Sequence, residues 1–169
     1  YRRVGEHVAA AEQAGAVAVQ FTCSSISPCA EVVRSLVGIP VFKIDEAMVD
    51  EALSLGSRIA VAATAQTALR PVAALVRAQA EAMGRQVTVE SAFCAGAYEA
   101  LWAGHMEAHD RLVRDTLVDL VARSDVVLLA QASMARGATT LPAEQQRVPI
   151  LTSPRLALER LRAELSGRC

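Results

Sequence analysis

The stretch VQFTCSSISPC, residues 19–29, places a thiol and several hydroxyl groups directly after an apolar run. Its first cysteine, Cys23, allows two interpretations. It is either a small buried hydrophobe, because free cysteine is among the most frequently buried residues, or a reactive thiol in an active site. Backbone N–H groups at the start of a following helix would stabilise a thiolate there. Such a thiolate could act as a nucleophile or as a base that removes an acidic C–H proton.

Hydroxyl side chains recur at the ends of two further apolar runs. RIAVAATAQT, residues 58–67, carries Thr64 and Thr67, and RSDVVLLAQASMA, residues 123–135, carries Ser133. Together with Ser24 and Ser25 and with backbone N–H groups, these hydroxyls could hold a carboxylate without an arginine. The alternative is that each one caps a helix. Recurrence of the pattern at three strand ends favours a binding site.

Other residues with potential chemistry have little support from their spacing. His105 and His109 are four residues apart and could share a helical face, but Met106 stands where a zinc protease needs glutamate, and no third ligand is apparent. We therefore expect no metal site. Cys29 is expected to be structural, and neither Cys94 nor Cys169 has a position that indicates a role. No GxGxxG or P-loop pattern occurs, so a nucleotide site has no support.

The composition favours a small molecule as the partner. Of 169 residues, 53% are hydrophobic and 4% aromatic, with a mean hydropathy of +0.29. Alanine and valine supply most of the apolar content, which favours helices packed on buried parallel strands. The few aromatic residues argue against a surface that binds nucleic acid by stacking on its bases. A formal net charge of −1 offers no attraction to nucleic acid or anionic lipid. No run approaches the roughly 20 apolar residues of a membrane span, and four cysteines without a CxxC pair fit a reducing cytoplasm.

The order of elements predicts an α/β fold with parallel sheets flanked by helices. Apolar strands alternate with amphipathic helices that end at glycines. The expected strands are residues 16–22, 39–44, 58–64, 86–93, 126–130 and 148–152, and the expected helices are 1–16, 30–37, 46–56, 65–84, 109–125 and 153–165, the last capped by Ser153. Since ligands bind at the carboxyl ends of such strands, the polar loops are expected to face each other across a cleft.

These segments resemble the aspartate/glutamate/hydantoin racemase superfamily, which also includes arylmalonate decarboxylase and maleate isomerase. GAVAVQFTCSSIS resembles the first cysteine loop, IPVFKIDEA the strand with its I-x-E-A segment, RIAVAATAQT the threonine loop, and SDVVLLAQASMA the second cysteine loop. The resemblance implies two similar Rossmann-like lobes with the active site in the cleft between them, no cofactor and a homodimer. We assign residues 1–50 and 150–169 to lobe one and residues 51–149 to lobe two.

The resemblance also implies roles for individual residues. Cys23 matches the first of two catalytic cysteines, which exchange protons at the carbon next to a carboxylate. The residues expected to bind the substrate are Ser24, Ser25, Thr64, Gln66, Thr67 and Ser133. Glu46 matches the glutamate of the I-x-E segment, and a structural role at a helix start is favoured there over direct chemistry.

The chain departs from the family pattern at the second cysteine, where Ala132 cannot carry a proton. A single cysteine is similar to arylmalonate decarboxylase, although that enzyme retains the second one. Three functions therefore stay open. They are a racemase or isomerase acting on a small amino acid, hydantoin or dicarboxylate, a decarboxylase, and a carboxylate-binding protein without racemase chemistry. The family also begins with a strand before the helix that opens this chain, so the first strand of lobe one is expected to be missing.

Overall fold

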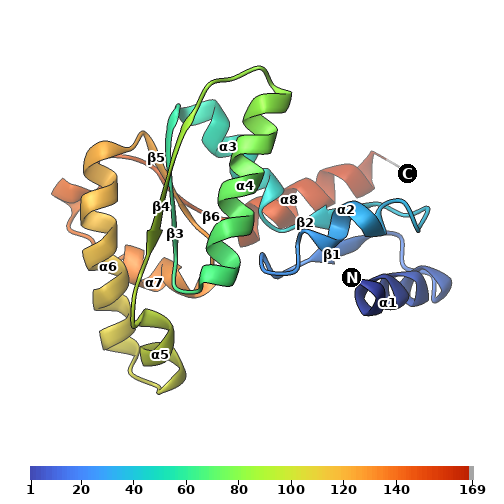
Figure 1. Cartoon of the computed structure of the whole chain (residues 1–169), viewed down its shortest axis with the longest axis horizontal. Coiled ribbons are helices and arrows are strands. Elements are labelled where there is room, and N and C mark those ends of the chain that lie inside the picture. Colours follow the sequence, from blue (N-terminus) through green and yellow to red (C-terminus); the bar gives the residue numbers. More distant parts are fainter. Residues whose placement is uncertain (168–169) are drawn as a thin grey trace.

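Two parallel sheets organise the computed structural model, which describes residues 1–167 (Figure 1). This arrangement confirms the predicted α/β class, with parallel sheets flanked by helices. Residues 168 and 169, and with them Cys169 and the end of the predicted lobe one, lie outside the described residues. No helix within residues 1–167 is long and apolar enough to cross a membrane. The cytoplasmic location stays a prediction.

The elements follow the expected alternation of helix and strand. The strands are β1 (Val19–Phe21), β2 (Val41–Lys43), β3 (Arg58–Ala63), β4 (Thr88–Phe93), β5 (Val126–Leu129) and β6 (Ile150–Thr152). The helices are α1 (Arg2–Gln13), α2 (Cys29–Val33), α3 (Glu46–Leu55), α4 (Gln66–Ala82), α5 (Ala97–Trp102), α6 (Met106–Arg123), α7 (Ala135–Ala138) and α8 (Ser153–Ser166), with 3₁₀ turns η1 (Ala132–Met134) and η2 (Ala143–Gln145).

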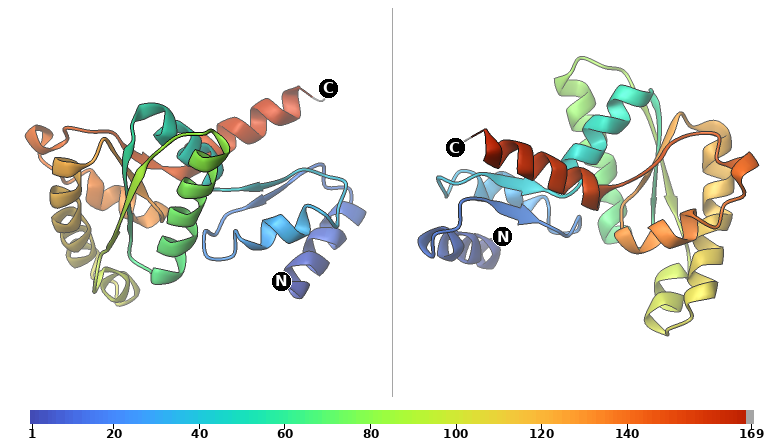
Figure 2. Two further views of the ribbon diagram at one scale, coloured as in Figure 1. Left: turned by 45° about the horizontal axis from the view of Figure 1, so that its top comes forward. Right: turned by 180° about the vertical axis from the view of Figure 1, so that it is seen from behind.

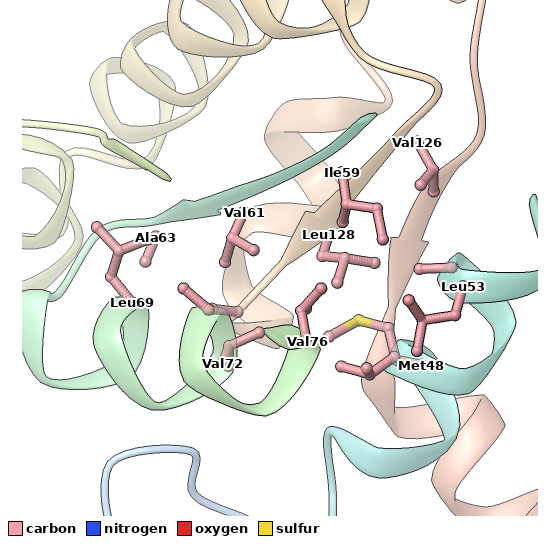
Figure 3. Packing of buried hydrophobic residues seen from close by; sticks show 14 of the residues in the cluster. Met48, Leu53, Ile59, Val61, Ala63, Leu69, Val72, Val76, Val126 and Leu128 are labelled. Carbon is pink, nitrogen blue, oxygen red and sulfur yellow. The ribbon is translucent and has the colours of Figure 1, made fainter. Parts of the chain in front are cut away.

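The larger sheet has the strand order β4-β3-β5-β6, with every pair parallel. Successive side chains of a strand point to opposite faces, so β3 contributes to two cores. Ile59, Val61 and Ala63 pack with α3 and α4 (Figure 3), whereas Ala60 and Ala62 pack with α6 on the other face. Burial on both faces explains why the central strands are continuous apolar runs rather than alternating ones.

The smaller sheet consists of β1 and β2, paired in parallel and packed with α1 and α2. Val8, Phe21, Ala30, Val33 and Val41 form its core, separate from the two cores of the larger sheet. The smaller sheet lies beside the larger one, and α8 extends from the end of β6 toward the side of the smaller sheet (Figures 1 and 2). The smaller sheet therefore has its own hydrophobic core.

The predicted lobe boundaries, 1–50 with 150–169 and 51–149, differ from the strand pairing at one element. β6 was grouped with lobe one, but it pairs with β5 in the larger sheet. Its apolar residues Ile150 and Leu151 are partly buried there against the two cores of that sheet. α8 returns toward the smaller sheet, so the rest of the predicted division stays a prediction.

Several local features differ from the sequence-based expectation, and α7 and the first turn of α6 are among the helical segments not expected. α2 ends at Val33, because residues 35 and 36 bond to carbonyls three positions back and tighten the chain into a turn. α5 was not predicted, since Ala97 is its only buried residue and it has no apolar stripe. The prediction that Ser153 caps α8 is wrong: Thr152, still extended in β6, is the N-cap, and Ser153 is the first helical residue.

Candidate active site

A pocket of about 320 Å³ lies where strand ends of both sheets come together. Its walls come from the β1 loop (residues 22–28), the end of β2, the β3 loop (64–65) with the start of α4, α5, the β5 loop (130–134) and the start of α8. The lining residues are Thr22, Cys23, Ser24, Ser25, Ile44, Ala65, Thr67, Ala68, Tyr98, Ala130, Gln131, Ala132 and Ser153. Because ligands of open α/β sheets bind at carboxyl strand ends, we take this pocket as the candidate active site.

The structure brings together part of the predicted site. Cys23, Ser24, Ser25 and Thr67 line the pocket, and so does Ala132 at the second-cysteine position. These residues follow the ends of β1, β3 and β5.

Three other predicted residues do not line the pocket. Thr64 is buried, whereas Gln66 and Ser133 are exposed. Helical neighbours point about 100° apart, because a helix turns once in 3.6 residues. Thr67 therefore faces the pocket while the adjacent Gln66 does not. Binding by Gln66 and Ser133 is a prediction that this geometry does not support.

Cys23 is the exposed cysteine at the end of β1. It lies in a turn six residues before α2, and not at the start of the helix itself. Its carbonyl oxygen accepts hydrogen bonds from the backbone N–H groups of Ile26, at 3.2 Å, and Ser27, at 3.1 Å. The Ser27 hydroxyl donates to the same oxygen at 3.1 Å. These bonds fix the backbone of the turn and leave the thiol at the pocket.

Two serines of the β1 loop connect the smaller sheet to the larger one. The buried Ser24 hydroxyl donates to the carbonyl oxygen of Ala130 at 3.2 Å. The exposed Ser25 hydroxyl donates to Thr67 Oγ1 at 3.0 Å. Serine in this loop thus joins residues far apart in sequence, as well as supplying possible ligand contacts.

Gln131 holds two loops of the larger sheet together. Its side-chain oxygen accepts from the backbone N–H of Thr64 at 2.7 Å, from the Thr64 hydroxyl at 3.0 Å and from the backbone N–H of Ala65 at 3.1 Å. The β3 and β5 loops are therefore fixed to each other beside the pocket. The sequence analysis assigned Gln131 no role, since nothing in its neighbours indicates which loop it contacts.

Sequence reasoning also missed further pocket residues, among them Ile44, Tyr98 and Ser153. Tyr98 belongs to the unpredicted α5, and its ring lies 6.0 Å from that of the exposed Trp102. Gly96, with φ of 77°, adopts the left-handed conformation that starts this helix. A glycine with an aromatic residue two positions later is too weak a signal to have located the pocket wall.

Glu46 has the structural role that the sequence analysis favoured. One carboxylate oxygen accepts from Arg34 Nη2 at 2.7 Å, and the other accepts from the backbone N–H of Lys43 at 3.0 Å. Glu46 is the first residue of α3, where a negative charge is favourable. It fixes the turn between β2 and α3 and does not line the pocket.

The histidines and the other described cysteines lie away from the pocket lining. His109 is fully buried on α6 and bonds to Asp110, whereas His105 is exposed. Cys29 and Cys94 are buried, and burial raises the pKa of the Cys94 thiol. Among residues 1–167, no group of three or more possible ligands is placed to hold a metal ion.

Asp45, between β2 and α3, is a buried carboxyl next to the pocket residue Ile44. Burial raises its pKa from 3.8 to about 6; a hydrogen bond with Ser24 and the charge of Lys43 oppose this rise, and the charge of Glu46 adds to it. A raised pKa means that the folded protein binds this proton more tightly than the unfolded chain does. The ionised form of Asp45 therefore costs stability.

Asp45→Asn is expected to stabilise the fold increasingly as the pH rises. Below about pH 4, Asp45 is protonated in both states and the variant should gain little. As the pH passes through 4 to 6, the wild type loses stability that the variant keeps, and the gap should reach about 3 kcal/mol above neutrality. Urea unfolding across this range measures the gap, with the exposed Asp119→Asn as a control. A gap independent of pH would contradict the prediction.

A family model described as Asp/Glu/Hydantoin racemase matches residues 2–161, nearly the whole chain. The fold and the pocket at its strand ends agree with this match, and the chain belongs to that family. No curated protein sequence matches the chain.

Solved structures with the same fold include racemases and a decarboxylase. A glutamate racemase from Bacillus anthracis has a TM-score of 0.76 at 14% identity, over 99% of this chain and 64% of its own. An allantoin racemase from Klebsiella pneumoniae has a TM-score of 0.70 at 20% identity, over 96% and 65%. Arylmalonate decarboxylase has a TM-score of 0.58 at 21% identity, over 93% and 72%. The chain thus spans just under two thirds of the length of these two racemases.

Proposed function

We propose that the chain acts as a cofactor-independent enzyme that moves a proton at the carbon next to a carboxylate of a small molecule. Cys23 would be the base. The observation that carries the proposal is the position of Cys23, an exposed thiol that lines a pocket at strand ends in a chain of the racemase family. The substrate would be a small amino acid, hydantoin or dicarboxylate.

The chemical character of the pocket supports binding through neutral donors. Its polar lining consists of hydroxyls, such as those of Ser25, Thr67 and Ser153, with the thiol and the Gln131 amide. None of the described lining residues is charged. A carboxylate, and the enolate-like charge that develops on proton removal, would therefore be held by hydroxyl and backbone N–H donors.

Racemisation or isomerisation is our first choice of reaction, and decarboxylation is the second. Decarboxylation stays the second choice because of Ala132. With alanine at that position, Cys23 is the one thiol among the described lining residues. Loss of carbon dioxide from a malonate needs a single proton delivered to one face, whereas racemisation needs proton exchange on both faces.

The test is a panel of amino acids, hydantoins and arylmalonates incubated with the protein in D₂O. Deuterium incorporation next to the carboxylate with inversion supports a racemase, and release of carbon dioxide supports a decarboxylase. A thermal shift with carboxylates, without exchange or carbon dioxide, would contradict the proposal and favour a carboxylate-binding protein.

The proposal includes the expectations that the protein works as a homodimer and without a cofactor. Both come from the family resemblance. Size-exclusion chromatography with light scattering gives the mass of the assembly, and exchange assays before and after exhaustive dialysis against a chelator test the need for a bound group. A monomer that is fully active, or activity lost on dialysis and regained with an added metal, would contradict the respective expectation.

A further inference from the structure

Tyr98 of α5 is the one aromatic residue among the described lining residues of the candidate active site. The residue is 39% exposed, so part of its ring is open to a ligand. Its neighbour Ala97 is fully buried in the core that β3 and α6 share, which fixes the start of α5. The ring of Trp102 lies 6.0 Å from that of Tyr98 at an angle of 59°, a tilted arrangement that aromatic pairs favour. Tyr98 is therefore a fixed aromatic wall of the pocket.

The other apolar side chains of the pocket are smaller than Tyr98. They are Ile44, Ala65, Ala68, Ala130 and Ala132. In a pocket of about 320 Å³, the ring of Tyr98 is thus the largest apolar group that a ligand can contact. Aromatic rings pack favourably against other aromatic rings and against apolar groups. An apolar or aromatic part of a ligand is therefore expected to lie against Tyr98.

The lining offers no opposite charge to a second charged group on a ligand. None of the described lining residues is charged. Lys43, which precedes the lining residue Ile44, lines a different pocket and pairs with Glu31. A charged group that leaves water without a partner costs free energy. A substituent with its own carboxylate would therefore be disfavoured in this pocket.

Hydrogen bonds within the protein already use two of the neutral donors. The Ser24 hydroxyl donates to the carbonyl oxygen of Ala130, and the Ser25 hydroxyl donates to Thr67 Oγ1. An ionised carboxylate can accept about four hydrogen bonds. With these two protons engaged, the lining can hold one carboxylate more readily than two.

We propose that Tyr98 is a specificity-determining residue that selects substrates whose reacting carbon carries an uncharged, preferably aromatic, substituent. The carboxylate lies against hydroxyl and backbone N–H donors, and the substituent lies against the Tyr98 ring. Dicarboxylic substrates are disfavoured. The effect on turnover rests on the proposed function, whereas the selectivity in binding does not.

An aromatic substituent also suits proton removal by a thiolate. When Cys23 takes the proton, the electron pair of the C–H bond stays on the substrate and spreads into the carboxylate and the aromatic ring. Return of a proton restores the C–H bond, so nothing is oxidised or reduced. Because the pocket stabilises negative charge with neutral donors, delocalisation within the substrate supplies part of the stabilisation that a cationic side chain would supply.

The binding of two acids to the full chain tests the selectivity. In 2-phenylpropionate and 2-methylsuccinate the carboxylate is attached to a carbon that carries a methyl group, and the third substituent is phenyl in one and carboxymethyl in the other. Ligand-observed NMR is expected to show that 2-phenylpropionate binds about tenfold or more tightly. The fluorescence of Trp102, the one tryptophan of the chain, reports binding beside Tyr98. Equal or tighter binding of 2-methylsuccinate, or no detectable binding of 2-phenylpropionate, would overturn the proposal.

Substitutions at Tyr98 assign the selectivity to this residue. Tyr98→Arg supplies a cation and is expected to reverse the order of the two acids. Tyr98→Phe keeps the ring and should keep the order, whereas Tyr98→Leu should bind 2-phenylpropionate about 2 to 10-fold more weakly. Tyr1→Phe, at a residue that is 71% exposed and outside the lining, is the matched control and should bind as the wild type does. Thermal unfolding checks that each variant is folded. An unchanged ratio of affinities in folded Tyr98→Arg and Tyr98→Leu would overturn the role of Tyr98.

Deuterium exchange at the carbon next to the carboxylate provides the functional readout. The kcat/KM for 2-phenylpropionate is expected to exceed that for 2-methylsuccinate in the wild type, and Tyr98→Arg should reverse this ratio. Faster exchange of 2-methylsuccinate by the wild type would overturn the selectivity and leave the proposed function in place. Exchange of neither acid, with the order of binding as expected, would contradict the proposed function and leave the selectivity of Tyr98 in place.

Discussion

Cys23→Ser is expected to lower the rate of proton exchange next to the substrate carboxylate by about 10² to 10⁴-fold. A hydroxyl is a far weaker base than a thiolate near neutral pH, so serine keeps the shape of the side chain and removes the proton transfer. Since Cys23 is exposed and its backbone is held by bonds to its own carbonyl oxygen, the substitution should leave the fold and the pocket intact. Exchange of a substrate proton for deuterium measures the loss, and thermal unfolding checks the fold.

Cys29→Ala is the matched control. Cys29 is buried in the core of the smaller sheet and does not line the pocket. Its replacement should cost some stability and leave the exchange rate per folded molecule nearly unchanged. Full activity in Cys23→Ser, or an equal loss in Cys29→Ala at equal folded fraction, would sink the assignment of Cys23 as the base.

Ala132→Cys is expected to give the pocket a second thiol and to raise inversion of configuration by about 10²-fold or more over the wild type. Ala132 is exposed and lines the same pocket as Cys23, so a sulfur can be added there without displacing a buried neighbour. With one thiol, the proton on the second face must be exchanged by a weaker group such as a hydroxyl or water, so inversion is slower than exchange. With two, a proton can leave one face and be replaced on the other.

Chiral chromatography of substrate recovered from D₂O separates the two outcomes, since inversion and deuterium content are measured on the same sample. Ala132→Ser is the control for added size without a strong base, and Ala132→Cys combined with Cys23→Ser should lose inversion again. An Ala132→Cys protein that exchanges deuterium as the wild type does, with no gain in inversion, would show that position 132 does not reach the reacting carbon.

The strands and the α/β class follow from local properties of the chain. The apolar runs at residues 58–64 and 126–130 are long enough and apolar enough to be buried on both faces, and the structure has β3 and β5 there. α5 was missed because a helix with one buried residue leaves no periodic signal. For the same reason Tyr98 was absent from the predicted site.

The sequence predicted which loops line the candidate site better than it predicted which side chains of those loops face the pocket. The recurrence of hydroxyl residues after three strands indicated the loops that line the pocket, because strand direction alone brings carboxyl ends to one edge. Which residue of each loop faces the pocket depends on how the following helix begins. Thr67 and Ala132 line the pocket, whereas their neighbours Gln66 and Ser133 do not. A sequence pattern does not show which of two adjacent residues a helix turns toward the pocket.

The residues of VQFTCSSISPC indicated Cys23 as the thiol to test, and this stretch together with three later segments of the sequence carried the family resemblance. The hydrogen bonds that join the two sheets could not be predicted from that stretch. Ser24 and Ala130 are 106 residues apart, and Ser25 and Thr67 are 42 apart. Contacts over such separations depend on how the two sheets pack against each other. Those are properties of packing, and local sequence patterns carry no information about them.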